Sequence, residues 1–445
     1  AALRAVGGHV AVGFDPSRLN GVKTVVAGSA IRDNNPELVR ARERGLLVLH
    51  RSQALHAVMQ GRRVVAVAGT NGKTTTSSML TVVLQHAGWD PSFAIGGELV
   101  GAGTNAHEGS GEVFVAEADE SDSSFLVYRP EVSVVTNVQP DHLDHYGTAE
   151  RVREAFAAFA ANVAPSGLLV ACADDEGSAA LAASVSAAGQ RVRTYGASGE
   201  ADVRVVDVRP EGGRISFVPV DGGRRLRQVR LQVPGRHNVL NAAAAYTAAV
   251  ELGVPESVAV DGLEAFTGTR RRFEARGQAA EVRVFDDYAH NPAKVAAAVA
   301  TGQQVAGAGR LVVVFQPHLY SRTLDFAAEF GRALGGADEV IVMDVYAARE
   351  DPVPGVTGAL VADAVPLPAQ SVQFVPSWSA VPAAAAERAR EGDVVLTVGA
   401  GDVTMIGREV LALLQERQQG RAGAAVEQGG GQRGEPQGEG HGGRL

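Results

Sequence analysis

Short runs of β-branched and other apolar residues recur along the chain, and stretches with helical periodicity separate them. Runs of this length predict buried strands, and strands that alternate with helices predict parallel sheets. The chain is therefore predicted to have an α/β fold. The principal predicted strands cover residues 64–68, 112–116, 132–136, 168–172, 282–286, 311–315, 339–344 and 394–398. The principal predicted helices cover residues 75–86, 149–161 and 239–252.

Two further segments have patterns of their own. Residues 1–60 contain predicted strands at 22–28 and 46–50 and predicted helices at 36–44 and 53–60, which make only part of a domain. Residues 201–233 alternate apolar and polar positions with a period of two around the turns EGG and DGG. This alternation predicts an antiparallel meander inserted in the second domain.

The length of 445 residues is too great for one hydrophobic core and suits about three domains. We expect domains at 1–60, 61–267 and 268–416, followed by a tail at 417–445. The tail is rich in Gly, Gln and Arg and poor in large apolar residues, so we expect it to be disordered. The chain begins with Ala within a predicted helix, and we expect its true N-terminus to be missing.

Composition and charge exclude several classes of protein. The 41 Lys and Arg residues are outnumbered by 50 Asp and Glu residues, and the net charge of −9 argues against binding to nucleic-acid backbones. The sequence has no apolar run near the roughly 18 residues of a membrane span and no signal-peptide pattern at its start. The single cysteine, Cys172, cannot form an intrachain disulfide, which suits a reducing compartment and is also compatible with an oxidising one.

The most specific motif is AGTNGKTTT at residues 68–76, which follows a predicted strand and opens a predicted helix. This is the context of a phosphate-binding loop, in which glycines let backbone N–H groups converge on an anion. Lys73 would supply a cation to the terminal phosphates, and the Thr74 hydroxyl would be a Mg²⁺ ligand. Val67 stands where the usual pattern has its first glycine, so this loop is a shortened variant. The alternative is an ordinary glycine-rich turn, against which the strand and helix argue.

Polar clusters follow the next two predicted strands. EADESD at 117–122 places carboxylates at the carboxyl edge of a parallel sheet, where they can hold Mg²⁺ beside a phosphate loop. A solvated acidic turn is the alternative. TNVQPDHLDH at 136–145 offers His and Asp side chains for a second metal or a substrate. From the residues alone, a helix-capping Asp with surface histidines is the favoured interpretation of that second cluster.

Further polar segments lie later in the chain. In GRHNVLN at 235–241, Asn238 is predicted to cap the Ala-rich helix, although two carboxamides three residues apart can also bind an adenine edge. In the third domain, RRRFE at 270–274 is followed by DDYAHNP at 286–292 and QPHLYSR at 316–322, each at the end of a predicted strand. Acid, imidazole and guanidinium groups at successive strand ends predict one crevice, with ordinary loop polarity as the alternative.

Together with SAIRDNNPEL at 29–38 and VYAAREDPVPGVTG at 345–358, these motifs resemble those of the Mur ligase family, over residues 1 to about 415. Members of that family are ATP-dependent enzymes that form amide bonds in peptidoglycan precursor synthesis. The resemblance implies an incomplete N-terminal Rossmann-like domain for the UDP-sugar, a central P-loop ATPase domain and a C-terminal Rossmann-like domain. Within the family, the motifs are most similar to those of members that join L-alanine to UDP-N-acetylmuramate through an acyl phosphate. This similarity implies a cytoplasmic protein, a monomer or weak dimer, without nucleic-acid partners or membrane insertion.

The resemblance also implies roles for individual residues. The implied ATP-binding residues are Gly69, Thr70, Asn71, Gly72, Lys73, Thr74, Thr75, Asn238 and Asn241 at the adenine, Arg272 at the terminal phosphate, and Asp287 at the ribose. The implied Mg²⁺ ligands are Thr74 and Glu117 for one ion and His142 for a second. The implied substrate residues are Ser121, Tyr288, His290, His318 and Arg322. Lys73, Arg272 and His290 are the implied catalytic residues.

The chain also departs from the family pattern. It begins after the glycine-rich turn that usually binds the UDP diphosphate, and Asn71 stands where these alanine ligases more often have His. Leu319 replaces a frequent Arg, and Asn291 replaces a frequent second His, which is expected to shift recognition around the carboxylate or the amino acid. Two alternative functions stay open: a related ligase with a tripeptide or cyanophycin-type acceptor, and a nucleotide-binding regulatory protein without turnover. The acidic cluster and the third-domain crevice argue against the second alternative.

Overall fold

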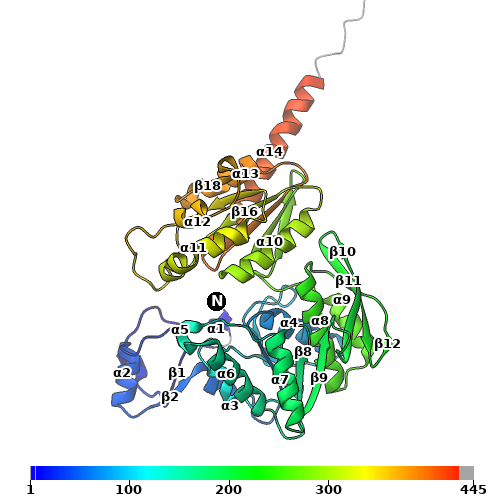
Figure 1. Ribbon diagram of the computed structural model, residues 1–445. Coiled ribbons are helices and arrows are strands. Elements are labelled where there is room, and N and C mark those ends of the chain that lie inside the picture. The colour runs from blue at the N-terminus through cyan, green and yellow to red at the C-terminus, as the bar shows by residue number, and fades with distance from the viewer. Residues whose placement is uncertain (1, 6, 430–445) are drawn as a thin grey trace, which may run out of the picture. The chain divides into compact units, whose positions relative to one another are not determined.

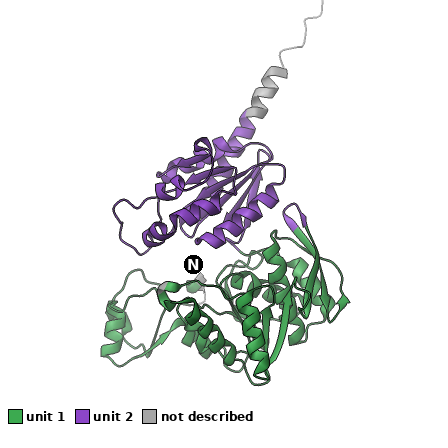
Figure 2. Ribbon diagram, viewed as in Figure 1, with its two compact units in different colours: residues 1–209, 215–269 green, residues 210–214, 270–445 purple. Residues whose placement is uncertain are grey.

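The protein is described by a computed structural model that covers residues 2–5 and 7–429 (Figure 1). The chain forms two compact units (Figure 2). Unit 1 comprises residues 1–209 and 215–269, and unit 2 comprises residues 210–214 and 270–445. Of the expected domain boundaries, the one at residue 267 lies two residues from this division.

The first 60 residues contain a parallel pair of strands, β1 and β2, with helices beside them. The four elements expected there are present, each within a few residues of its expected bounds. The elements are α1 (Ala2–Ala5), η1 (Pro16–Leu19), β1 (Thr24–Ala27), α2 (Pro36–Glu43), β2 (Leu47–His50) and α3 (Arg51–Val58).

The rest of unit 1 is built on one large sheet, whose strand order is β12-β11-β10-β9-β8-β7-β3-β6-β4-β5, with β13 paired to β11. Its strands are β3 (Arg63–Ala68), β4 (Ser92–Ala94), β5 (Ala106–His107), β6 (Val113–Glu117), β7 (Val132–Val135), β8 (Leu168–Cys172), β9 (Arg191–Gly196), β10 (Val203–Glu211), β11 (Arg214–Asp221), β12 (Arg224–Arg225) and β13 (Val229–Leu231). Its helices are α4 (Lys73–His86), η2 (Ser124–Val127), α5 (Leu143–Tyr146), α6 (Ala149–Ala161), α7 (Glu176–Ala187), α8 (Arg236–Leu252) and α9 (Glu256–Ala265).

The central strands are buried on both faces, which explains why they are continuous apolar runs in the sequence. Along β3, Val65 and Val67 pack into a core with α4, α8 and α9. The intervening Val64 and Ala66 pack into a second core with α6 and α7. β3 pairs in parallel with β6 and β7, so the loops that follow these three strands share one sheet edge.

The predicted meander is present, and its strands extend the large sheet. β11 pairs antiparallel with β12 and β13, as the period-two alternation predicts. β10 pairs in parallel with β9, and this pairing joins the meander to the parallel strands. The alternation of side chains identifies strands but does not identify their partners.

Unit 2 contains a second, mostly parallel sheet with the order β14-β15-β19-β16-β17-β18. Its strands are β14 (Glu274–Ala279), β15 (Val282–Asp287), β16 (Leu311–Phe315), β17 (Glu339–Val342), β18 (Val372–Phe374) and β19 (Val394–Val398). One core joins it to α10, α11 and α12, and another joins its other face to α13 and α14. The helices are α10 (Pro292–Ala306), α11 (Tyr320–Leu334), α12 (Ala359–Asp363), η3 (Ala369–Ser371), η4 (Trp378–Ala380), α13 (Val381–Arg388), η5 (Asp402–Met405) and α14 (Ile406–Gly429).

The expectation of disorder from residue 417 is wrong for residues 417–429, because helix α14 continues through them. The segment Gln415–Arg421 contains Gln, Glu, Arg and a single Gly, and most of these residues favour helices. The remainder of the expected tail, residues 430–445, lies outside the described residues. Within the described part of the chain, none of the helices combines the length and apolar character needed to cross a membrane.

Candidate active site

The predicted phosphate loop lies between the end of β3 and the start of α4. Two glycines are required by their surroundings. Gly69 has φ of +136°, and a Cβ there would lie 2.0 Å from Thr136 Oγ1. Gly72 has φ of +87°, and a Cβ there would lie 2.5 Å from Asn241 Oδ1. The loop therefore packs closely against the segment after β7 at Gly69 and against α8 at Gly72, without room for a side chain at either glycine.

The segment after β7 holds the phosphate loop by a set of hydrogen bonds. Asn71 N–H donates to Asn137 Oδ1 at 2.8 Å, and the Asn71 carbonyl accepts from Asn137 Nδ2 at 3.0 Å and from Thr136 Oγ1 at 2.6 Å. Thr70 N–H donates to the Asn137 carbonyl at 3.1 Å, and Gln139 N–H donates to Thr70 Oγ1 at 3.0 Å. The loop conformation is thus set by side-chain and backbone groups of the segment after β7.

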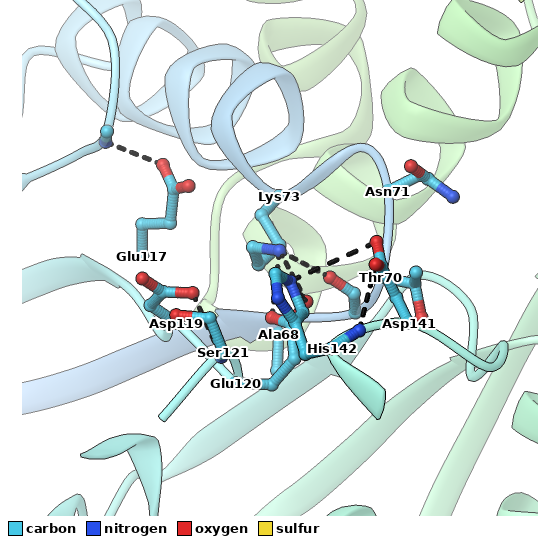
Figure 3. A network of polar contacts seen from close by, with 12 residues as sticks. Ala68, Thr70, Asn71, Lys73, Glu117, Asp119, Glu120, Ser121, Asp141 and His142 are labelled. Carbon is cyan, nitrogen blue, oxygen red and sulfur yellow. Dashed lines mark hydrogen bonds and ion pairs between the residues drawn. The ribbon is translucent and has the colours of Figure 1, made fainter. Parts of the chain in front are cut away.

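Lys73 is the first residue of α4, and its side chain is 13% exposed. Its ammonium donates to the Gly69 carbonyl at 2.8 Å and to Glu120 Oε1 at 2.9 Å (Figure 3). Burial acts to lower the pKa of Lys73, but the nearby carboxylates of Glu120 and Glu117 outweigh it and raise the pKa above its ordinary value. Lys73 is therefore a permanent cation at the N-terminus of a helix, the arrangement that a polyphosphate requires.

Thr74 and Glu117 meet beside the loop. Thr74 Oγ1 donates to Glu117 Oε1 at 2.9 Å, and Gly96 N–H donates to Glu117 Oε2 at 2.6 Å. A hydroxyl and a carboxylate in contact are oxygen donors of the kind that Mg²⁺ prefers, and this ion usually takes its other ligands from phosphates and water. Among the described residues, no group of three or more His, Cys, Asp or Glu side chains is placed to hold a metal alone. The pair therefore fits a metal ion that arrives with a nucleotide.

His142 and Ser121 lie near the same strand ends. His142 precedes α5 with a φ of +53°, and its Nε2 is 3.9 Å from Glu120 Oε1 and 3.9 Å from Asp141 Oδ2. Ser121 N–H donates to Asp119 Oδ1 at 3.2 Å, so the acidic segment is folded on itself (Figure 3). The structure thus brings His142 to the acidic cluster beside Lys73.

The predicted capping role of Asn238 is wrong. Helix α8 begins at Arg236 after Gly235, without a side-chain cap, so Asn238 lies inside its first turn. Asn238 Nδ2 donates to the Pro234 carbonyl at 2.6 Å, and its Oδ1 accepts from Asn241 Nδ2 at 3.1 Å. Asn241 Oδ1 accepts from the Thr76 hydroxyl at 3.2 Å, so this buried carboxamide pair connects α8 to α4. The adenine role remains a prediction.

In unit 2, Asp287 ends β15 and is held by backbone donors. Its Oδ2 accepts from Phe273 N–H at 2.8 Å, and its Oδ1 accepts from Ala289 N–H at 2.8 Å. Burial raises the pKa of Asp287 above its ordinary value, and the neighbouring Arg272 opposes that rise. The guanidinium of Arg272 lies 5.5 Å from the centre of the Tyr288 ring. The predicted ribose and phosphate residues are thus adjacent.

His290 follows in the same loop. Its Nδ1 is 2.9 Å from the Tyr288 carbonyl. A carbonyl only accepts, so Nδ1 carries the proton and Nε2 of the neutral ring is the acceptor. Burial is the largest cause that lowers the pKa of His290 to about 3. At neutral pH the ring is uncharged.

His318, Leu319 and Arg322 come from the end of β16 and the start of α11. The His318 ring lies 6.1 Å from the His290 ring and stacks on the Tyr346 ring at 5.9 Å with an angle of 16° between planes. Arg322 donates to the His290 carbonyl at 3.4 Å. Leu319 precedes α11 with φ of +72°, and its backbone N–H donates to the Tyr346 carbonyl at 3.0 Å.

Asn291, the other departure in this region, has a structural role of its own. Its Oδ1 accepts from Lys294 N–H at 2.9 Å and caps the N-terminus of α10. The Asn-Pro pair at this position is a strong helix-start signal, so the residue supports the helix whatever it does for a ligand.

The predicted residues form two groups, one in each unit. Gly69 to Thr75, Glu117, Ser121, His142, Asn238 and Asn241 lie in unit 1, and Arg272, Asp287, Tyr288, His290, His318 and Arg322 lie in unit 2. Three residues have contacts in the site that the sequence did not predict: Glu120, Asn137 and Tyr346. All three stand in the motifs quoted above, but their contacts join segments that are distant in sequence.

A lysine-bearing loop that follows a parallel strand and opens a helix, with a carboxylate on the adjoining strand, defines a phosphate-binding α/β protein. Three models of one family match this chain. They are the Mur ligase family, catalytic domain over residues 1–63, the Mur ligase middle domain over 67–249, and the Mur ligase, glutamate ligase domain over 271–401. The chain belongs to the Mur ligase family and has its three-domain α/β fold.

Individual relatives agree with that assignment. The chain is 62% identical to a UDP-N-acetylmuramate–L-alanine ligase of Kineococcus radiotolerans, over 93% of this chain and 88% of the relative. It is 55% identical to the ligase of that name from Saccharopolyspora erythraea, over 94% and 86%. Among solved structures, a UDP-N-acetylmuramate–alanine ligase from Thermotoga maritima has a TM-score of 0.77 at 29% identity, covering 93% of this chain and 90% of that one.

Proposed function

We propose that this protein joins L-alanine to the lactyl carboxylate of UDP-N-acetylmuramate in an ATP-dependent reaction of peptidoglycan precursor synthesis. The observation that carries the proposal is the buried Lys73 ammonium at the start of α4, in a loop whose glycines admit no side chain. The names of relatives that are 52–62% identical over nearly the whole chain supply the substrates.

The reaction runs in two chemical steps. An oxygen of the lactyl carboxylate attacks the γ-phosphorus of ATP, and the bond to the bridging oxygen breaks to release ADP and leave an acyl phosphate. The amine of L-alanine then attacks the acyl carbon, the C–O bond to phosphate breaks, and an amide and inorganic phosphate result. The first step brings an anion to a polyanion, so positive charge at fixed positions is the main requirement. Lys73 supplies such a charge, and we propose Arg272 as a second cation at the terminal phosphate.

Mg²⁺ is part of the proposal. Thr74 and Glu117 would hold one ion and His142 a second, and the ions would offset phosphate charge and align the phosphates. The contact between Thr74 and Glu117 supports the first of these sites. Gly96 N–H would keep the Glu117 carboxylate oriented while a ligand binds.

Further residues would orient L-alanine, the muramyl group and the nucleoside of ATP. We propose that the neutral His290 accepts a hydrogen bond from the amino group of L-alanine through Nε2, because its Nδ1 is directed to the Tyr288 carbonyl. Arg322 and His318 would bind the carboxylates of the alanine and the muramyl group. Asp287 would accept hydrogen bonds from the ribose, and Asn238 and Asn241 would contact the adenine.

A substrate panel tests this function. The protein is incubated with UDP-N-acetylmuramate, ATP and MgCl₂ and with one amine at a time: L-alanine, glycine, L-serine or the tripeptide. Phosphate release and the mass of the nucleotide-sugar product are measured together. We expect both signals to be greatest with L-alanine. Preference for the tripeptide would indicate the ligase with another acceptor, and ATP binding without amide formation would indicate the regulatory alternative.

The cellular setting is also a proposal. Both nucleotide substrates favour the cytoplasm as the site of the reaction. We propose that a monomer or weak dimer acts there, and sedimentation velocity at micromolar protein concentrations tests that state.

A further inference from the structure

Glu120 is a buried carboxylate that the reaction scheme above does not use. Its side chain is 2% exposed. The Glu120 carbonyl accepts from Ser123 N–H at 3.1 Å and from the Tyr146 hydroxyl at 2.5 Å. These two hydrogen bonds fix the backbone of Glu120 and so limit where its carboxylate can lie.

The carboxylate of Glu120 faces the Lys73 ammonium with both oxygens. Oε1 accepts a hydrogen bond at 2.9 Å, and Oε2 lies 2.8 Å from the same nitrogen without hydrogen-bond alignment (Figure 3). The Gly69 carbonyl takes another donor of Lys73 at 2.8 Å. The cation that a nucleotide needs is thus already paired with an anion of the protein.

The other carboxylates of this cluster have different partners. Glu117 accepts from Thr74 and from Gly96 N–H, and Asp119 accepts from Ser121 N–H. His142 Nε2 is 3.9 Å from Glu120 Oε1, beyond hydrogen-bond distance. The ion pair with Lys73 is therefore the dominant interaction of the Glu120 charge.

A phosphate at Lys73 would place two negative groups around one ammonium. The Glu120 carboxylate is shielded from water. Charges in such a shielded site interact more strongly than in water, and salt screens them less. Moving Glu120 away from Lys73 would instead leave a buried carboxylate without its partner, which is also unfavourable. Either outcome weakens the binding of a nucleotide that brings no positive charge of its own.

We propose that Glu120 is a positioning residue that acts as the resident counter-ion of Lys73 and makes nucleotide binding dependent on a divalent cation. It holds the ammonium in the loop before the nucleotide binds. Its negative charge lowers the affinity for a metal-free polyphosphate. It lowers the affinity less for a polyphosphate whose charge is offset by a divalent cation. The inference rests on the proposed function, because it assigns the polyphosphate to this loop.

The test compares ADP binding by calorimetry in excess EDTA and in saturating MgCl₂. Glu120→Gln keeps the size and one acceptor oxygen but removes the charge. We expect this variant to bind metal-free ADP about tenfold or more tightly than the wild type. The increase in ADP affinity that MgCl₂ gives should be smaller than in the wild type by the same factor. Glu120→Met should act in the same direction, while Glu120→Asp, which keeps the charge, should bind metal-free ADP as weakly as the wild type.

Glu131→Gln is the matched control, because Glu131 pairs with Arg63 at 2.7 Å at the opposite end of β3. It removes the same charge from the same unit and should leave both ADP affinities unchanged. The inference is overturned if neither Glu120→Gln nor Glu120→Met tightens metal-free binding, or if Glu131→Gln tightens it equally. If the wild type binds no ADP even with MgCl₂, the proposed function fails instead.

Discussion

The ion pair between Lys73 and Glu120 is expected to affect both the ligation rate and the stability of the protein. Replacing Lys73 with Ala removes the cation from the loop and leaves a carboxylate that is 2% exposed without its ion pair. We expect Lys73→Ala to lower the ligation rate at least about 10²-fold and to lower the free energy of unfolding by about 3 kcal/mol. Phosphate release and urea denaturation measure the two effects.

The double variant Lys73→Ala with Glu120→Gln separates these effects. It removes the unpaired charge, so it should recover a large part of the lost stability and none of the activity. Lys23→Met, which changes another lysine of unit 1, is the control for the rate measurement. A folded Lys73→Ala protein that releases phosphate at the wild-type rate would refute the role of this residue.

His290 is a source of pH-dependent stability in unit 2. Its pKa in the folded protein is about 3, below the ordinary value of 6.5. Above pH 6.5 the ring is neutral in both the folded and the unfolded state and contributes nothing. As the pH falls below 6.5, the His290 ring becomes protonated in the unfolded chain but not in the folded protein. The free energy of unfolding therefore falls by about 1 kcal/mol per pH unit.

We therefore expect His290→Asn to lose less stability than the parent protein between pH 7 and pH 5. Trp378 packs against a core of unit 2, and in a Trp89→Phe background it is the remaining tryptophan of this two-tryptophan chain. Its fluorescence during urea denaturation reports the stability of that unit. Equal losses in the two proteins would contradict the assignment.

At the scale of elements, helix α4 is bounded by two segments that use glycine for different reasons. Gly69, before its start, has φ of +136°, and a Cβ there would lie 2.0 Å from Thr136 Oγ1. Gly88, after its end, has φ of +79°, with open space where a Cβ would lie. We expect Gly69→Ala to weaken Mg-ADP binding at least about tenfold, because the loop must shift. Gly88→Ala should cost about 1 kcal/mol of stability through backbone strain and leave ADP affinity unchanged.

Calorimetric titration of both variants measures this difference. The pair is informative because both positions require a positive φ, and one of them also requires the absence of a side chain. Unchanged ADP affinity in Gly69→Ala would show that the nucleotide binds elsewhere.

The elements themselves were largely predictable, and the reasons are visible in particular segments. Residues 64–68 and 311–315 are apolar at every position, because strands buried on both faces need such runs. β4, β5 and β18 are two or three residues long and lie toward sheet edges, where no pattern develops. β9 was missed because Arg191 and Arg193 interrupt its apolar positions, and these arginines pair with Glu251 on α8.

The candidate site was predictable in its segments and not in its contacts. The loops after β3, β6 and β7 were identified, since chemistry at the carboxyl ends of parallel strands is a pattern in the sequence. The ion pair between Lys73 and Glu120 and the hydrogen bonds between Asn71 and Asn137 depend on how those loops pack. The capping prediction for Asn238 failed because the helix begins at Arg236, three residues before its predicted start at residue 239.

At the scale of the whole molecule, the fold of unit 2 depends on residues of helix α14 up to Gln418. Val410 and Leu414 are fully buried, Arg417 donates to the Ala386 carbonyl at 2.9 Å, and Gln418 accepts from Ala280 N–H at 3.0 Å. A chain truncated after Gly420 keeps these contacts, and we expect its ligation rate to stay within about twofold of the full chain. Thermal denaturation and phosphate release check this expectation.

Truncation after Glu409 removes the same four contacts. Loss of two buried aliphatic side chains costs about 2–5 kcal/mol each, so unit 2 should unfold or precipitate. Full activity of this shorter chain would mean that α14 is dispensable for the fold of unit 2.

The central claim is that the sugar carboxylate is activated by the terminal phosphate of ATP before L-alanine attacks. Isotope transfer tests it most directly. UDP-N-acetylmuramate labelled with ¹⁸O in both oxygens of the lactyl carboxylate is converted in the presence of ATP, MgCl₂ and L-alanine, and the released phosphate is analysed by mass spectrometry. The account predicts one ¹⁸O atom in each phosphate and one in the new amide. Unlabelled phosphate, or phosphate release that yields no alanyl product, would contradict it.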